Sequence, residues 1–491
     1  MSLNGNRTGV WVLAAPLLLM GLAGAATLDG AQSAGTFVAT GGMKTPRANH
    51  TATLLTNGKV LITGGTADYG NPLASSELYD PQRKEFTTAA DMTSPRMAHT
   101  ATLLPDGRVL VTGGTTGPGA GMVGSSSAEI YDASTGTFTP AANMIGKHVC
   151  HQAHLLADGR VMLVGGVDGA GGVSKAELYD PHAGAFAAAE LSVSWGNTCQ
   201  ASASALLPDS RVLIIAEDSG VAGIYDAVSG SFASADYPPL DAWAFNNGLP
   251  SATLLMSGRV LVAGGGHDGG LIALAGLYAS DGGFAPAGRM TMGRALHSAT
   301  LLPDGSVLMA GTYLYGGASL ASAELYAPVA DAFTAAGSMS TARANHTATL
   351  LNNGRVLIAG GSAGGIPHAS AELYTPHVLI RAPRLSFADE TGRGAIWHAS
   401  TVEMVSPRSP AVAGEVLSMY TRRLVEGSVI PPQVAVGGRL AGIVYFGDAP
   451  GYPGYSQVNF RVPNGVSTGS AVPVRLTYIG RPSDEVSLAV R

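Results

Sequence analysis

Apolar and polar residues alternate in short runs along most of the chain, and glycine-containing turns separate these runs. An alternating run from His50 to Leu55 is followed by the turn Asn57-Gly58, and then by an apolar run that ends in Gly64-Gly65. An Asn-Gly or Asp-Gly pair between two such runs is the strongest short-range signal for a β-hairpin. The same kind of turn recurs at residues 106–107, 158–159, 304–305 and 353–354. The pattern therefore predicts an all-β chain of short antiparallel strands joined by tight turns.

A unit of about 49 residues recurs seven times. Each copy has a tyrosine in the same register, and in six copies a phenylalanine follows six or seven residues later. The tyrosines are Tyr79, Tyr131, Tyr179, Tyr225, Tyr278, Tyr326 and Tyr374. Tyr374 has no such partner, but the segment around Phe37, upstream of the first copy, resembles the missing piece. A closed ring uses this arrangement, so residues 35–377 are predicted to form a seven-bladed β-propeller closed by an N-terminal strand.

The pattern changes after residue 377. Residues 384–491 hold no copy of the unit, and short apolar runs such as 416–420, 433–436 and 457–462 are separated by turn residues. About seven such runs in about 105 residues predict an immunoglobulin-like β-sandwich at the C-terminus.

Composition narrows the functional classes. The chain has 491 residues, enough for two or three domains, and only 13% of them are charged. A net charge of −6 is small for this length and gives no reason to expect nucleic acid as a partner.

The N-terminus has the pattern of a secretory signal peptide. Arg7 is followed by an apolar stretch at 10–22 and by Ala23-Gly24-Ala25, so cleavage is expected near Ala25 and residues 1–25 are predicted to be removed. No later segment is apolar enough to span a membrane. The mature protein is therefore expected to be secreted. In that compartment two states are open to Cys150 and Cys199: a disulfide between the third and fourth units, or two buried thiols.

Several marks of the unit resemble the Kelch repeat: the double glycine after an apolar strand, the tyrosine before an aromatic residue, and a Pro-Arg-x-x-His opening such as residues 46–50. The C-terminal segments, above all the run 457–463, resemble a domain of exported acidobacterial proteins. That resemblance implies an extracellular bacterial protein and no particular chemistry.

A Kelch propeller followed by an Ig-like domain also resembles galactose oxidase. The resemblance implies a copper site built from a Tyr–Cys cross-link, a Tyr-His dipeptide and a further histidine of the C-terminal domain. This chain has no Tyr-His dipeptide, its cysteines lie outside the first unit, and His398 is the single histidine of the predicted C-terminal domain. No metal, cofactor or catalytic residue is therefore predicted.

The start of the innermost strand carries the candidate binding residues. Histidine stands there in five units and arginine occurs three residues earlier in four: His50, His99, His151, His297 and His346, and Arg47, Arg96, Arg294 and Arg343. Around a central funnel these side chains would favour an anionic or polyhydroxylated ligand. The alternative is structural, with histidines bonding neighbouring blades and arginines pairing with a recurrent glutamate. Trp195 and Trp243 fall where the ring of histidines is interrupted and are candidate sugar contacts.

These observations predict an exported, non-catalytic binding or adhesion protein. Its expected partner is a polysaccharide or an extracellular protein, recognised through the propeller. The alternative is an extracellular carbohydrate-active enzyme, either an oxidase with a degenerate copper site or a propeller hydrolase or lyase.

Overall fold

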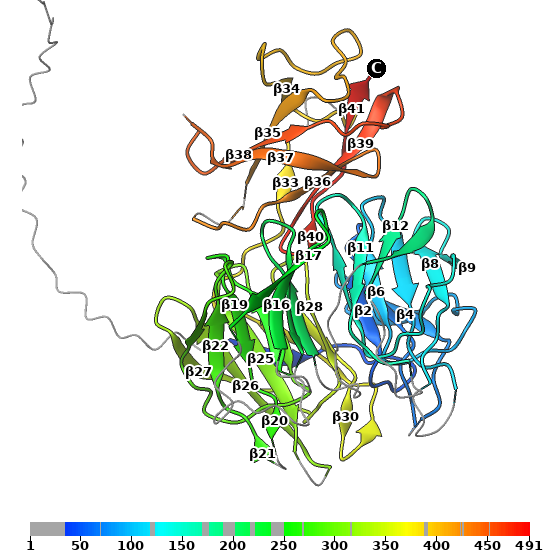
Figure 1. The fold of residues 1–491 in the computed structure, drawn as a ribbon, viewed down its shortest axis with the longest axis vertical. Helices are drawn as coiled ribbons and strands as arrows, with labels where there is room; N and C mark the ends of the chain where they lie inside the picture. Colours follow the sequence, from blue (N-terminus) through cyan, green and yellow to red (C-terminus); the bar gives the residue numbers. More distant parts are fainter. Residues whose placement is uncertain are drawn as a thin grey trace, which may run out of the picture. The chain divides into compact units, whose positions relative to one another are not determined.

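The fold is described from a computed structural model of the chain. The described residues are 35–68, 70–117, 123–168, 176–189, 202–216, 221–236, 250–267, 270–314, 317–386, 391–422, 424, 427–450 and 452–491. Within these ranges every regular element is a β-strand, which confirms the predicted all-β class (Figure 1).

Seven four-stranded antiparallel sheets form the blades of a propeller. The first three blades contain β2 (Thr51–Leu54), β3 (Val60–Thr63), β4 (Ser76–Asp80) and β5 (Glu85–Thr88); β6 (Thr100–Leu103), β7 (Val109–Thr112), β8 (Ala128–Asp132) and β9 (Thr137–Pro140); and β10 (Gln152–Leu155), β11 (Val161–Val164), β12 (Glu177–Asp180) and β13 (Ala185–Ala188). Blades 4 and 5 contain β14 (Ser202–Leu206), β15 (Val212–Ala216), β16 (Val221–Asp226) and β17 (Ser231–Ala235), and β18 (Ser251–Leu254), β19 (Val260–Ala263), β22 (Ala275–Tyr278) and β23 (Phe284–Pro286).

Blade 6 contains the longest strands of the propeller: β24 (Ser298–Leu301), β25 (Val307–Tyr313), β26 (Ser319–Ala327) and β27 (Ala332–Ser338). Blade 7 contains β28 (Thr347–Leu350), β29 (Val356–Ala359), β32 (Ala371–Thr375) and β1 (Thr36–Ala39). Two small hairpins pair β20 (Gly266–His267) with β21 (Gly270–Leu271), and β30 (Ser362–Ala363) with β31 (Ile366–Pro367). The first strands of neighbouring blades contact one another all round the ring.

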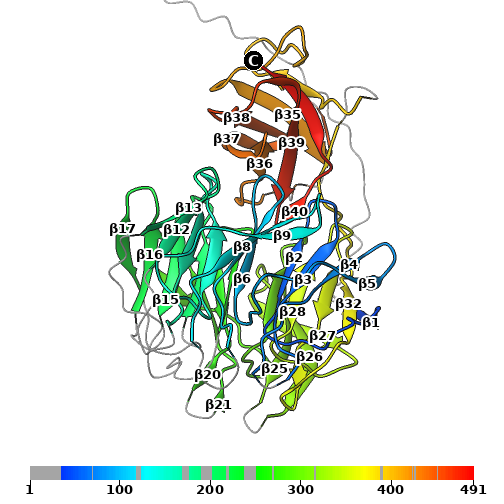
Figure 2. The same cartoon turned by 90° about the vertical axis from the view of Figure 1, so that its right-hand side faces the viewer.

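The N-terminal strand completes the last blade, as the sequence predicts. β1 runs antiparallel to β32 with Phe37 opposite Tyr374, and in Figure 2 the dark blue β1 lies beside the yellow β32. The two ring centroids are 4.8 Å apart, the same separation as between Tyr79 and Phe86 in blade 1. Phe37 therefore supplies the aromatic partner that is missing after Tyr374.

The core of the propeller lies between the blades. The first four residues of the second strand are buried in each blade, as in β3, where all four residues are inaccessible to solvent. One core cluster combines Leu55 and Leu61 of blade 1 with Val109 and Tyr131 of blade 2. A strand sandwiched between two other sheets is covered on both faces, and this explains why its sequence is apolar throughout and does not alternate.

The C-terminal region forms a separate sheet of nine strands that curls around its own core. Its strands are β33 (Arg384–Leu385), β34 (Ile396–His398), β35 (Val416–Arg422), β36 (Gln433–Val436), β37 (Arg439–Asp448), β38 (Ser456–Arg461), β39 (Gly469–Tyr478), β40 (Arg481–Pro482) and β41 (Val486–Val490). β37 joins the two halves, since its first part pairs with β36 and its second part with β38. This shape is sandwich-like, whereas the immunoglobulin-like identity and the domain boundaries at residues 377 and 384 stay predictions. Within the part of the chain that the structure describes, no helix could span a bilayer.

Candidate functional site

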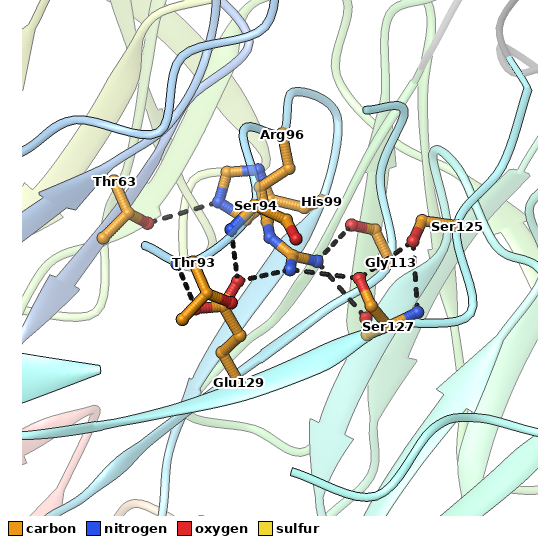
Figure 3. A network of polar contacts seen from close by, with 9 residues as sticks. All are labelled: Thr63, Thr93, Ser94, Arg96, His99, Gly113, Ser125, Ser127 and Glu129. Carbon is orange, nitrogen blue, oxygen red and sulfur yellow. Dashed lines mark hydrogen bonds and ion pairs between the residues drawn. The ribbon is translucent and has the colours of Figure 1, made fainter. Parts of the chain in front are cut away.

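The recurrent arginine of the unit is Arg96 in blade 2, and its side chain is fully buried near the start of the innermost strand. Its Nη1 atom donates to the carbonyl oxygens of Gly113 (2.8 Å) and Ser127 (3.2 Å) (Figure 3). Its Nη2 atom donates to the Ser127 hydroxyl (3.2 Å) and to Oε1 of Glu129 (2.7 Å). The backbone N–H groups of Thr93 and Ser94 donate to the same carboxylate, at 2.7 and 3.1 Å.

The same network recurs in the other blades that have the arginine. The ion pairs are Arg47–Glu77 (3.1 Å), Arg294–Glu324 (2.8 Å) and Arg343–Glu372 (2.9 Å). In blade 3 a histidine replaces the arginine, and Nε2 of His148 lies 3.0 Å from Oε1 of Glu177. Burial lowers the pKa of Arg47 and Arg343, while the paired carboxylates Glu77 and Glu372 act in the opposite direction.

These networks decide what the four arginines can contact. Each arginine side chain is at most 1% exposed, and its guanidinium group is surrounded by carbonyl, hydroxyl and carboxylate oxygens of its own blade. The pairing that the sequence offers as the structural alternative is therefore present. The arginines do not form an accessible basic funnel in this structure.

The ring of histidines joins neighbouring blades. Nε2 of His99 in blade 2 lies 3.0 Å from the Thr51 hydroxyl and 3.2 Å from the Thr63 hydroxyl of blade 1. The equivalent contacts are His151 with Thr100 (2.9 Å) and Thr112 (3.0 Å), His297 with Ser251 (3.0 Å), His346 with Ser298 (2.9 Å) and His50 with Thr347 (3.0 Å). At the interruption of the ring, Ser204 of blade 4 instead bonds His154 (2.6 Å) and Gln152 (2.7 Å) of blade 3.

These histidines are neutral at physiological pH. Burial, followed by the nearby arginine charge, lowers the pKa of His50 and His297 to about 3. The same causes hold the pKa of His346 well below the usual range, and burial does so for His99 and His151. Neutral rings bonded to hydroxyls serve the contact between blades, as the structural alternative proposes.

The double glycine belongs to the same contact. A Cβ atom on Gly64 would lie 2.3 Å from the Arg96 carbonyl oxygen and 2.7 Å from Cε1 of His99, both in the next blade. Gly65 has a φ of 88°, and its N–H group donates to the same Arg96 carbonyl at 2.9 Å. Close approach and positive φ both require glycine here. Arginine, histidine and glycine pair thus form one interblade joint.

An accessible concave surface remains along the innermost strands of blades 7, 1, 2 and 3. It is a wide, open depression of about 380 Å³, and its polar lining includes Thr51, Thr100, Thr102, Gln152 and Thr347, together with alanine methyl groups. His50, His99 and His151 also border this axial cavity, which places three of the predicted residues at its edge. The threonines and Gln152 are absent from the sequence prediction, although their alternation with alanine along each strand marks them as one face.

The other predicted residues lie elsewhere. Cys150 is disulfide-bonded and has a positive φ of 60°. Its predicted partner Cys199 and the candidate sugar contacts Trp195 and Trp243 lie outside the described residues, so their roles stay predictions.

Comparison with known proteins supports the propeller. Residues 96–145 match the Kelch motif family. No curated protein matches the chain. Among solved structures, a novel fungal alcohol oxidase of the AA5 family, determined in complex with copper, is 15% identical and has a TM-score of 0.62. The match covers 93% of this chain and 100% of the oxidase. The chain therefore folds as a seven-bladed β-propeller with a Kelch motif in its second blade. At this identity the likeness concerns the fold alone.

Among the described residues, no three His, Cys, Asp or Glu side chains are grouped so as to hold a metal ion. His398, the histidine of the C-terminal sheet, has Nδ1 2.5 Å from Oε1 of Glu415 and Nε2 3.0 Å from the Ser409 carbonyl oxygen. Both of its ring nitrogens are therefore already engaged within that sheet.

Proposed function

We propose that this protein is an exported, non-catalytic binding protein whose propeller recognises a polysaccharide. The axial cavity of about 380 Å³ carries this proposal. Its lining offers hydroxyl, amide and methyl groups together with the imidazoles of three histidines. Burial lowers the pKa of these imidazoles below the usual range. A surface without charged groups and with many hydrogen-bonding groups suits a neutral, hydroxyl-rich ligand.

The burial of the arginines changes the expected ligand. An accessible basic funnel would attract an anionic chain, but each guanidinium group is neutralised by a glutamate of its own blade. Of the two ligand classes favoured by the sequence, the polyhydroxylated one is therefore preferred. An extracellular protein is the other partner that a rigid ring of this kind could bind.

A glycan array probed with the mature protein tests the proposal. Thr102→Val removes a cavity hydroxyl and preserves side-chain shape, and no hydrogen bond of that hydroxyl is present among the described contacts. We expect it to weaken binding about threefold to tenfold, the value of one hydrogen bond. Thr139→Val, on the exposed outer strand of the same blade, is the matched control and should bind as the parent does. Equal binding by both variants, or turnover of any glycan by the parent, would refute the proposal.

A second candidate, with which the fold of the fungal alcohol oxidase is compatible, is an extracellular carbohydrate-active oxidase. The measurement is hydrogen peroxide release from sugars and alcohols by the mature protein after incubation with copper. Peroxide formation that requires both copper and intact protein would establish this candidate in place of the binding function.

A further inference from the structure

One face of the C-terminal sheet carries aromatic and amide side chains in register. Strand pairing places Trp397 of β34 opposite Ser418 of β35, Ser418 opposite Asn459 of β38, and Asn459 opposite Tyr445 of β37. The next row on the same face consists of Tyr420, Gln457 and Gly447. Four strands of different sequence origin therefore contribute to one surface, which we call the aromatic face.

Two rings of the aromatic face, Trp397 and Tyr420, pack against each other and, through Tyr420, against Tyr452. The centroids of Trp397 and Tyr420 are 5.3 Å apart in an edge-on arrangement, and Tyr452 follows 5.6 Å beyond Tyr420. On the neighbouring strand β38, Nε2 of Gln457 donates to Oδ1 of Asn459 at 2.8 Å. Rings that are fixed before a ligand arrives lose little conformational entropy on binding.

These side chains are not part of the core of the sheet. The intervening residues of the same strands, Leu417 and Met419 of β35 and Val458 and Phe460 of β38, are at most 1% exposed and form that core. The alternation in a strand directs Tyr420, Gln457 and Asn459 to the opposite side. Tyr452 is 60% exposed and Tyr445 is 43% exposed. Packing in the core does not explain several large, accessible rings gathered on one face. Such exposed apolar groups mark a site of interaction.

We infer that the aromatic face is a second binding site and that its ligand is a neutral polysaccharide chain. Aromatic rings stack on the apolar faces of sugar rings, and amide groups bond their hydroxyls. The inference takes its ligand class from the proposed function but places the contact on the C-terminal sheet rather than in the propeller.

The distribution of charge identifies the occupant as neutral. The two rows contain no charged side chain. The cations at their margins are engaged, since Arg422 stacks 4.2 Å from the centroid of Tyr455 and Nη1 of Arg461 donates to the Gly414 carbonyl at 2.7 Å. Within the two rows an anionic chain would find no cation, and a charged protein surface would find no complementary charge.

The dimensions suit a short stretch of chain. Trp397 and Tyr445 are three strand spacings apart, which corresponds to about 14 Å across the sheet. Rings at both edges with amides between them could therefore contact successive sugars of one extended chain.

A binding titration of the mature protein tests the aromatic face. The probes are soluble xyloglucan, mixed-linkage β-glucan and galactomannan, with polygalacturonate as the anionic comparison. Tyr445→Ala and Tyr452→Ala are each expected to weaken binding of a neutral chain about tenfold, because each removes a ring that the ligand would cover. Both rings are exposed, so neither truncation should impair folding. Val329→Ala, at a fully exposed apolar residue of the propeller, is the control for non-specific adhesion and should bind as the parent does.

Trp397→Phe provides an independent readout. Phenylalanine keeps a ring at the edge of the face, so binding should persist while part of the tryptophan fluorescence change on ligand addition is lost. Face variants that bind like the parent, or binding of polygalacturonate without any neutral chain, would overturn the inference.

The effect of Thr102→Val on binding distinguishes the aromatic face from the axial cavity, because Thr102 lines that cavity. If Tyr445→Ala and Tyr452→Ala weaken binding of the neutral chain and Thr102→Val does not, the result supports the aromatic face and contradicts the propeller site. If only Thr102→Val weakens binding, the result supports the propeller site and overturns the aromatic face. If all three variants weaken binding, the result supports both sites. If no neutral chain binds the parent, both proposals fail.

Discussion

Nε2 of His50 in the first blade lies 3.0 Å from the hydroxyl of Thr347 in the last blade. The same contact joins blades 1 and 2 through His99 and Thr51, also at 3.0 Å. The closing joint of the ring is therefore chemically the same as an internal joint. One further hydrogen bond repeats there, since the Gly361 N–H group donates to the Arg47 carbonyl oxygen at 2.8 Å just as the Gly65 N–H group donates to that of Arg96 at 2.9 Å.

Phe37→Ala should destabilise the closure of the propeller. The change removes the ring that packs 4.8 Å from Tyr374 and leaves β1 held to β32 mainly by backbone hydrogen bonds. Because Phe37 is half-buried, we expect a loss of about 2 kcal/mol, below the value for a fully buried phenylalanine. Urea unfolding followed by tyrosine fluorescence measures it. Val38→Ala, at the 60% exposed neighbour, should change stability by less than about 0.5 kcal/mol. Equal effects of the two changes would contradict the role of Phe37.

Arg96→Met should be strongly destabilising. It leaves the Glu129 carboxylate buried with only the two backbone N–H groups of Thr93 and Ser94 as donors. Removing one partner of a buried ion pair costs about 3–5 kcal/mol. The double change Arg96→Met/Glu129→Gln should cost less than the sum of the two single changes, because no buried charge remains. Denaturation midpoints of the four proteins provide the test, and strict additivity would contradict the pairing.

Acid should weaken the propeller through its histidines before most carboxylates titrate. Burial lowers the pKa of His297 from 6.5 to about 3. Between these two pH values the histidine is protonated in the unfolded chain and neutral in the folded chain. Stability from this group is present above pH 6.5 and is lost as the pH falls towards 3, by about 1.4 kcal/mol per pH unit. His297→Asn should make the dependence of unfolding free energy on pH shallower by about one proton between pH 6 and 4. Between pH 7 and 8 the parent and the variant should show the same slope. Parallel curves over the whole range would refute a neutral buried histidine.

The pair His398–Glu415 should respond to pH in the opposite direction. Burial alone lowers the pKa of His398, but the hydrogen bonds to Glu415 and the Ser409 carbonyl outweigh it and raise that pKa. Both ring nitrogens face acceptors, so the protonated ring with two N–H groups fits best. Its stabilisation is present below pH 6.5 and is lost as the pH rises through the raised pKa.

Glu415→Gln should therefore lower the unfolding free energy by about 2 kcal/mol at pH 6 and by much less at pH 9. Urea unfolding at the two pH values provides the comparison. Glu403→Gln, at an exposed carboxylate near the same ring, is the matched control and should have a smaller effect. Equal losses at pH 6 and pH 9 for Glu415→Gln would contradict a charged histidine.

The sequence by itself determined the architecture of the propeller, because the signals that specify it are local and repeated. Asn57-Gly58 and its equivalents define the hairpins, and the tyrosine register defines the blades. The unpaired Tyr374 and the displaced Phe37 even identify the closing strand. Backbone conformation and strand period depend on neighbouring residues, so they can be read from one copy and checked against six others.

Only the tertiary structure decided what the side chains do. Arg96 has the same sequence context whether it faces a ligand or Glu129, and its burial depends on a strand about 30 residues away. Likewise Trp397, Tyr420, Gln457 and Tyr445 are unremarkable in the sequence and become one surface only through the register of four strands. Burial, ion pairing and the meeting of distant side chains arise from long-range packing, which local patterns do not contain.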